Sequence, residues 1–100
     1  MRIATKVGAC QIDSLPGQSQ IAICHSFFVS HGRRGLGEGG RLKKKQLKAL
    51  YKANYDFALC TVAQGNCAQK KILKKQGWAM LTIFWNTRSS EITEIWGYEL

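Results

Sequence analysis

The chain has 100 residues, 45% of them hydrophobic and 10% aromatic, which is enough for one small domain with a core and too apolar for a disordered segment. Fifteen lysines and arginines against six acids give a formal net charge of +9, which can attract nucleic acid, acidic protein or a polyphosphate. No apolar run approaches the roughly 18 residues of a membrane span, and the N-terminus lacks an uninterrupted apolar signal region. We therefore expect a single cytoplasmic domain over residues 1–100.

The first two predicted elements are strands that pair as a hairpin. Residues 2–12 alternate loosely between apolar and polar side chains, and residues 19–29 return as a second strand rich in Ile, Phe and Val. Between them, Pro16 and Gly17 fit the two central positions of a type II turn, in which Gly supplies a positive φ.

A glycine-rich segment, residues 30–40, separates the second strand from a helical pattern. A strand, a glycine-rich turn and a helix in this order direct backbone N–H groups at an anion, and glycines permit close approach and positive φ. Arg33 and Arg34 add charge-assisted donors. Neither the GxxxxGK[ST] pattern of a P-loop nor the GxGxxG pattern of a dinucleotide site occurs in the chain. The segment therefore predicts an anion-binding loop of another kind.

Two helices are predicted after this loop, over residues 41–53 and residues 66–76. Gly77 is placed to end the second one. Helical spacing predicts that the buried sides carry Leu42, Gln46, Ala49, Leu50 and Ala53 in the first helix and Ala68, Ile72 and Leu73 in the second.

Ten of the 15 basic residues fall in these two helices. They are Arg41, Lys43, Lys44, Lys45, Lys48, Lys52, Lys70, Lys71, Lys74 and Lys75. A solvated helix face explains them most simply, and a nucleic-acid-binding surface is the alternative.

The remaining elements are strands. Residues 55–62 form a nearly continuous apolar run, as expected of a strand covered on both faces, and residues 78–85 and 92–99 form a final hairpin. The order β-β-α-β-α-β-β predicts a mixed α+β domain with a partly parallel sheet.

The cysteines show no metal-ligand or redox spacing. Cys10, Cys24, Cys60 and Cys67 contain no CxxC pair, so we expect free, buried thiols. A zinc site that combines some of them with the two histidines has no spacing in its favour, so no metal is expected.

The glycine-rich loop also contains Arg34-x-x-Gly37-x-Gly39. This pattern matches the Arg/Gln-x-x-Gly-x-Gly/Ala signature of acetyl-CoA binding, and the chain resembles the C-terminal two-thirds or more of a GNAT N-acetyltransferase domain. The strand that follows the signature helix, an Asn at the start of the next helix (Asn66) and a Gly-aromatic pair at its end (Gly77-Trp78) also fit. In that fold, the strand corresponding to residues 57–62 splays away from the central strand, and acetyl-CoA lies in the gap.

The resemblance implies an N-acetyltransferase that moves an acetyl group from acetyl-CoA to a primary amine of an unknown protein or small-molecule acceptor. The loop backbone would hold the pyrophosphate, the main chain of the central strand would bind the pantetheine arm, and Asn66 would bond the same arm. The expected cofactor-binding residues are Phe27, Phe28, Val29, Arg33, Arg34, Gly35, Leu36, Gly37, Glu38, Gly39, Gly40, Asn66 and Leu73. For Asn66 the alternative is a helix N-cap that needs no ligand.

The chain departs from the family pattern at the catalytic positions. Many members carry a Tyr seven residues after that Asn, which protonates the departing thiolate, and here the position is Leu73. The central strand has no acid to act as general base, but it has His25, which we expect to take that role. The alternative for His25 is a histidine satisfied by a neighbour on the sheet.

A usual family domain has a strand and a helix pair before the hairpin with which this chain starts. We therefore expect an acceptor site that is open or completed by a second subunit. An exposed first strand and an apolar surface with Phe84, Trp85 and Trp96 favour a homodimer. Two further functions remain open: a CoA-binding regulatory protein without turnover, which Leu73 favours, and a basic nucleic-acid-binding module.

Overall fold

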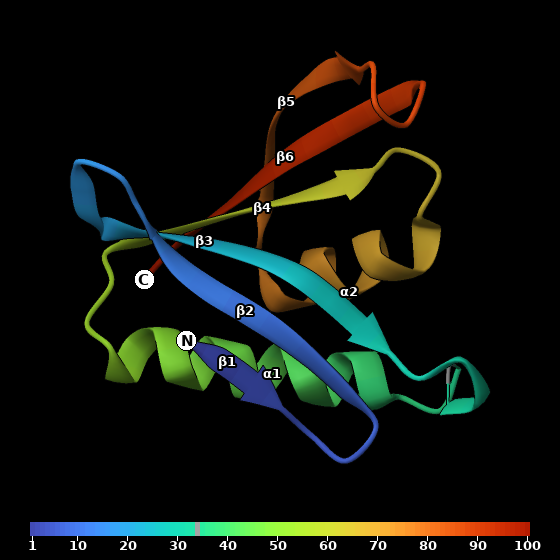
Figure 1. Ribbon diagram of the computed structural model, residues 1–100, viewed down its shortest axis with the longest axis horizontal. Helices are drawn as coiled ribbons and strands as arrows, with labels where there is room; N and C mark the ends of the chain where they lie inside the picture. Colours follow the sequence, from blue (N-terminus) through green and yellow to red (C-terminus); the bar gives the residue numbers. More distant parts are fainter. Residues whose placement is uncertain (34) are drawn as a thin grey trace.

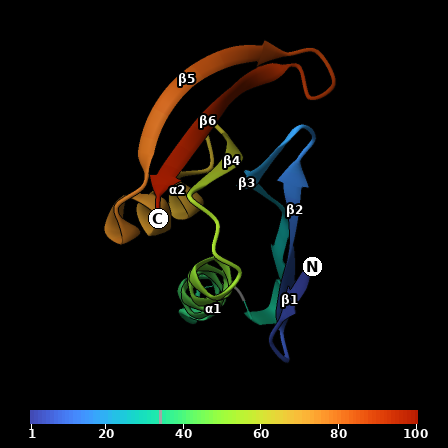
Figure 2. The same cartoon turned by 90° about the vertical axis from the view of Figure 1, so that its left-hand side faces the viewer.

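The computed structural model describes residues 1–33 and 35–100, apart from the side chain of Arg33. Its elements in chain order are β1 (Arg2–Ala4), β2 (Gly8–Leu15), β3 (Gln18–Val29), the 3-10 turn η1 (His31–Arg33), α1 (Glu38–Lys52), β4 (Phe57–Ala63), α2 (Cys67–Gln76), β5 (Ala79–Asn86) and β6 (Glu91–Glu99). Both helices lie on the same side of the sheet (Figures 1 and 2). Neither helix is long and apolar enough to cross a membrane.

The strands form one six-stranded sheet in the order β1-β2-β3-β4-β6-β5. Strands β3 and β4 are parallel, and the other neighbouring pairs are antiparallel. The predicted mixed α+β class with a partly parallel sheet is therefore confirmed.

The single strand predicted over residues 2–12 is wrong, because a turn divides it into β1 and β2. The backbone N–H of Thr5 bonds the carbonyl of Gly8 at 2.9 Å, and the Thr5 hydroxyl accepts from the N–H of Val7 at 3.3 Å. Loose alternation could not reveal this turn, since a threonine hydroxyl can satisfy backbone donors locally in place of a strand partner. Strand β1 is the sheet edge beside β2.

The two parallel strands β3 and β4 are paired over only part of their length. Pairing begins at Ile21 with Phe57 and ends at Cys24 with Cys60, after which β3 and β4 diverge (Figure 1). The splayed strands expected from the family resemblance are therefore present.

A β-bulge lies in β3 just beyond this point. Ser26 and Phe27 together face the single residue Cys10 of β2, and Ser26 adopts a φ of 54°. A positive φ is costly for a serine, and a bulge bends its strand and strengthens its twist. The bulge therefore turns β3 where it leaves β4.

Helix α1 begins at Glu38, three residues before the predicted start. The N-cap Gly37 has a φ of 79°, and its carbonyl accepts the N–H of Arg41 at 3.2 Å. The prediction began at Arg41 because glycines are poor helix formers, yet Gly39 and Gly40 lie in the first turn. No side chain of the described residues caps this helix end.

Both ends of helix α2 lie where the sequence predicts them. The Asn66 side-chain oxygen accepts the N–H of Gln69 at 3.2 Å, which confirms the N-cap interpretation. At the other end Gly77 has a φ of 98° and its N–H bonds the carbonyl of Leu73 at 3.1 Å. The hairpin turn between β2 and β3 is also confirmed, with Gly17 at a φ of 78°.

The core lies between the sheet and the two helices. It contains Ile3, Cys10, Ile12, Ala22, Cys24, Leu42, Leu50, Ala58, Cys60, Val62, Leu73, Trp78 and Trp96. Phe84 and Trp85 are exposed as predicted, but the prediction of Trp96 as a surface residue is wrong, because Trp96 packs in the core from β6, which lies between β4 and β5. Cys67 and Ala68 are wrong as buried residues, because the first turn of α2 extends beyond the core. Ala53 is also wrong as a buried residue, because it is the C-cap that follows the last residue of α1.

Candidate functional site

A groove of about 1200 Å³ runs between the N-terminal half of α1, the end of β3 and α2. It is lined by Phe27, Phe28, Val29, Gly35, Gly37, Gly39, Gly40, Arg41, Lys44, Leu47, Asn66, Ala68, Gln69, Ile72, Lys75 and Gln76. Gly39 brings the helices together, because a Cβ there would lie 3.0 Å from Cδ1 of Ile72.

The N-terminus of α1 opens onto this groove with the chemistry of an anion site. Its first N–H groups have no side-chain cap, and a helix N-terminus carries a partial positive charge. Gly35 and Gly37 have φ values of 83° and 79°, which confirms that the loop needs glycine at these positions. The cations Arg41, Lys44 and Lys75 line the groove as well.

A second, inner pocket of about 320 Å³ lies where β3 and β4 diverge. It shares Phe27, Asn66 and Gln69 with the groove, so the two cavities adjoin. The rest of its lining is Cys24, His25, Ser26, Lys43, Gln46, Cys60, Thr61, Val62 and Ala63.

The inner pocket is bordered by two buried polar side chains of α1. Lys43 is 2% exposed and Gln46 is 1% exposed. The Lys43 ammonium lies 4.3 Å from the Trp78 ring centroid and 5.6 Å from that of Phe27. Sequence reasoning missed Lys43 by grouping it with the surface lysines. Its position three residues before Gln46 and seven before Leu50 puts it on the buried stripe, and that spacing could have identified it.

Three thiols lie around the Lys43 ammonium. Burial raises the pKa of Cys24 to about 12 and also raises the pKa values of Cys10 and Cys60, although the charge of Lys43 acts against burial in each case. The thiols are therefore protonated at neutral pH and give Lys43 no anionic partner.

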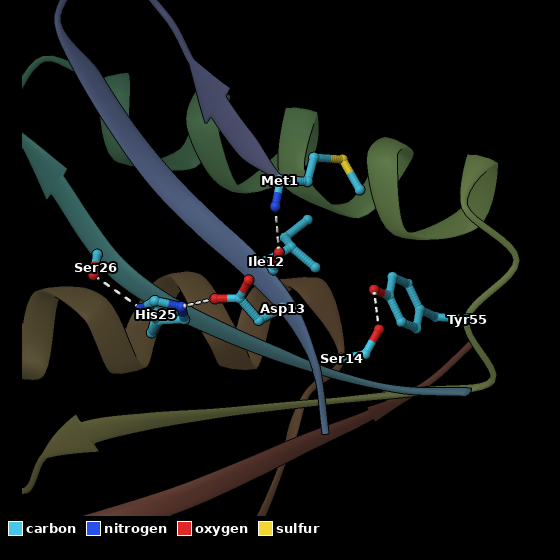
Figure 3. A network of polar contacts seen from close by, with 7 residues as sticks. All are labelled: Met1, Ile12, Asp13, Ser14, His25, Ser26 and Tyr55. Atoms are coloured by element: carbon cyan, nitrogen blue, oxygen red, sulfur yellow. Dashed lines mark hydrogen bonds and ion pairs between the residues drawn. The ribbon is translucent and has the colours of Figure 1, made fainter. Parts of the chain in front are cut away.

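The side chain of His25 lies on the outer face of β3, the face turned away from the two helices (Figure 3). Both of its ring nitrogens form hydrogen bonds there. Its Nε2 is 2.5 Å from Oδ2 of Asp13 on β2, and its Nδ1 is 2.9 Å from Oγ of Ser26. Because a carboxylate only accepts, Nε2 carries the proton in the neutral ring, and Nδ1 accepts from the Ser26 hydroxyl. This bond lowers the pKa of Asp13 below its usual value. Both ring nitrogens of His25 thus have side-chain partners on the sheet, and its predicted role as a base stays a prediction.

The structure gathers part of the predicted site. Phe27, Phe28, Val29, Gly35, Gly37, Gly39, Gly40 and Asn66 line the groove, and His25 lines the adjoining pocket. Three other predicted residues lie elsewhere: Leu36 is exposed, Glu38 pairs with Arg41, and Leu73 is fully buried in the core. Arg33 belongs to η1, and Arg34 lies outside the described residues.

No protein-family profile matches the chain, and no curated protein sequence matches it. Several solved structures do resemble it. The IAA acetyltransferase from Bacillus cereus has a TM-score of 0.84 at 12% identity, over 94% of this chain and 70% of its own. A GCN5-related N-acetyltransferase from Kribbella flavida has a TM-score of 0.83 at 18% identity, over 94% and 60%. The chain has the GNAT fold.

A third structure of this fold, a Bacillus subtilis acetyltransferase in complex with CoA, has a TM-score of 0.84 at 13% identity, over 94% of this chain and 69% of its own. The chain thus spans 60% to 70% of the length of these three structures. Among the described residues, no three His, Cys, Asp or Glu side chains gather as metal ligands.

Proposed function

We propose that this protein transfers an acyl group from a CoA thioester, acetyl-CoA in the simplest case, to a primary amine. One observation carries the proposal: the groove joins the uncapped N-terminus of α1 to the gap between β3 and β4. The first end suits a pyrophosphate and the second suits a thioester, so the groove can hold a CoA molecule along its length. The likeness to acetyltransferases of the same fold supports this use of the groove.

The chain's own groups fit the phosphates of CoA. The first-turn N–H groups of α1 and the open backbone at Gly35 and Gly37 would bond the pyrophosphate oxygens. Arg41, Lys44 and Lys75 would neutralise its charge and that of the 3′-phosphate. The Asn66 oxygen is used by its helix cap, so the amide nitrogen is the group that would donate to the pantetheine arm.

The divergence of β3 and β4 would supply the reaction centre. The residues His25, Ser26 and Phe27 of β3 lie beyond its last pair with β4, and the bulge at Ser26 and Phe27 bends the strand at this point. An N–H group in this stretch would bond the thioester oxygen and stabilise the negative charge that develops on it.

His25 would act as the general base for the amine. Ser26 donates to Nδ1 of His25, so this nitrogen is the one able to take a proton, through the Ser26 hydroxyl or through water. Asp13 on Nε2 stabilises the imidazolium that results. The amine nitrogen bonds to the carbonyl carbon, the C–S bond breaks, and CoA leaves as a thiolate. Among the described residues no tyrosine lines the groove or the inner pocket, so a water molecule would protonate the thiolate, and the His25 imidazolium would return its proton to solvent.

The first test is titration of the protein with acetyl-CoA by calorimetry, with two matched glycine variants. Gly37 and Gly17 have nearly the same φ, 79° and 78°, but only Gly37 lines the groove. Gly37→Ala is expected to weaken binding about tenfold or more, because a Cβ strains the loop by about 1–2 kcal/mol and displaces its N–H groups. Gly17→Ala is expected to leave the affinity unchanged.

Binding without turnover of any amine would instead favour the CoA-binding regulatory protein. A His25→Ala variant separates the two, because it should lower the acetylation rate and leave the affinity for acetyl-CoA as it is. Failure of the wild-type protein to bind acetyl-CoA at millimolar concentration would overturn the proposed function.

A second copy of the chain remains the predicted partner. Met80, Leu81, Ile83, Phe84 and Trp85 are between 43% and 61% exposed on β5, which forms a sheet edge. Such a contiguous apolar strand is typical of an interface. Light scattering at micromolar concentration should give twice the chain mass, and Trp85→Lys should give a monomer. A wild-type monomer would contradict the dimer.

A further inference from the structure

Among the described residues, Lys43 and Gln46 are the two polar side chains that burial leaves without adequate partners. Among residues 1–33 and 35–100, Lys43 forms no ion pair, and the Gln46 carboxamide has no hydrogen-bond partner apart from the thiol of Cys10. A thiol such as that of the neighbouring Cys10 is only a weak donor or acceptor. A buried ammonium and a buried amide left in this condition destabilise the folded chain.

The aromatic rings beside Lys43 compensate for only part of the free energy lost when its ammonium is buried. The ammonium lies over Trp78 and near Phe27, and cation–π contacts of this kind contribute less than the desolvation of a buried charge costs. The rings also position the ammonium, since they hold the lysine beneath the sheet rather than letting it extend to solvent.

Both side chains border the inner pocket and lie on the same side of α1, three residues apart. An ammonium and a carboxamide N–H side by side match the two oxygens of a carboxylate. The pocket volume of about 320 Å³ also exceeds the needs of an acetyl group, since a single water in the liquid occupies about 30 Å³.

We propose that Lys43 and Gln46 bind a carboxylate at the far end of the acyl group, so that the preferred donor is a dicarboxylic acyl-CoA such as succinyl-CoA. The inference rests on the proposed function, because it takes the groove as the CoA site. The CoA phosphates would lie at α1's N-terminus, the thioester between β3 and β4, and the carboxylate on Lys43 and Gln46. The ligand thereby supplies the anion that the described chain does not.

The test compares the affinities of CoA, butyryl-CoA and succinyl-CoA by calorimetry. Butyryl and succinyl have the same chain up to the terminal group, so their difference reports the carboxylate. Succinyl-CoA is expected to bind the wild-type protein about tenfold more tightly or better, as a charge-assisted bond to a buried site implies. Lys43→Met and Gln46→Leu should each reduce this preference. Lys48→Met, an exposed lysine on the same helix that lines neither cavity, should leave it intact.

Free succinate provides a further arm, because the carboxylate could be carried by another small molecule. A rise in Tm with succinate that Lys43→Met abolishes, without any preference among the acyl-CoAs, would support a carboxylate site but overturn its assignment to the donor. Equal binding of butyryl-CoA and succinyl-CoA with no response to succinate would overturn the inference and leave the proposed function standing. If none of the three CoA ligands binds, the proposed function fails, and the succinate result alone decides for or against the carboxylate site.

Discussion

Helices α1 and α2 are both rich in lysine, yet they differ at their N-termini and on their buried sides. The N-terminus of α2 is capped by Asn66, whereas that of α1 has Gly37 and no side-chain cap. The only fully buried residue of α2 is Leu73, whereas α1 buries Lys43 and Gln46 as well as leucines. Helix α2 is thus satisfied within the chain, while α1 presents donors that a ligand could satisfy.

The difference shows that the polar groups without strong partners lie on one of the two helices. Unsatisfied donors are costly in a protein whose total stability is only about 5–15 kcal/mol. They are gathered here on one helix, beside the groove and the inner pocket, while Leu42 and Leu50 of the same helix pack in the core with residues of α2 and the sheet.

The largest change in stability is expected from truncating the buried side chain of α2. Leu73→Ala removes a fully buried side chain between the sheet and α1, and should lower the free energy of unfolding by about 3 kcal/mol. Urea denaturation measures this directly. A loss below about 1 kcal/mol would mean that α2 does not support the core as described.

A substitution on α1 is expected to raise the free energy of unfolding instead of lowering it. Lys43→Met keeps the volume and removes a buried charge that has no anion, so the ligand-free protein should gain about 1 kcal/mol or more. Thermal unfolding without ligand tests this, with Lys48→Met as the neutral control. A destabilised Lys43→Met protein would show that the aromatic contacts outweigh the desolvation of the ammonium.

A smaller loss is expected from removing the cap of α2. Asn66→Ala leaves the N–H of Gln69 without its 3.2 Å acceptor and should cost about 1 kcal/mol. Asn66→Asp, which keeps the acceptor, should restore the stability. Because α1 has no such cap, acetyl-CoA should slow hydrogen exchange at the first turn of α1 more than at that of α2.

The smallest effect concerns the Asp13–His25 contact on the outer face of the sheet. The bond from His25 lowers the pKa of Asp13 below its ordinary 3.8, so the contact stabilises the fold above that pH. This contribution disappears as the pH falls through the lower pKa of the folded state. Tm measured from about pH 6 to pH 2 should therefore fall less steeply in Asp13→Asn than in the wild type. Parallel profiles would contradict the contact.

The amino-acid sequence alone determined the features that depend on neighbouring residues. Gly17, Gly37 and Gly77 were predicted at turns or loops because a positive φ favours glycine, and all three have one. Apart from the turn that divides the first predicted strand into β1 and β2, the order of helices and strands followed from hydrophobic spacing, and the glycine-rich loop with Asn66 sufficed to indicate the fold.

The tertiary structure decided whatever depends on how separate elements meet. Asp13 contacts His25 only because of the register between β2 and β3 beside the bulge, and the sequence could not indicate that register. From the sequence, Lys43 was grouped with the surface lysines around it. In the folded chain it is buried, with its ammonium over the Trp78 ring. Periodicity shows which side of a helix is apolar, but burial depends on what packs against that side. The inner pocket, formed where two strands part, is therefore a property of the assembled sheet.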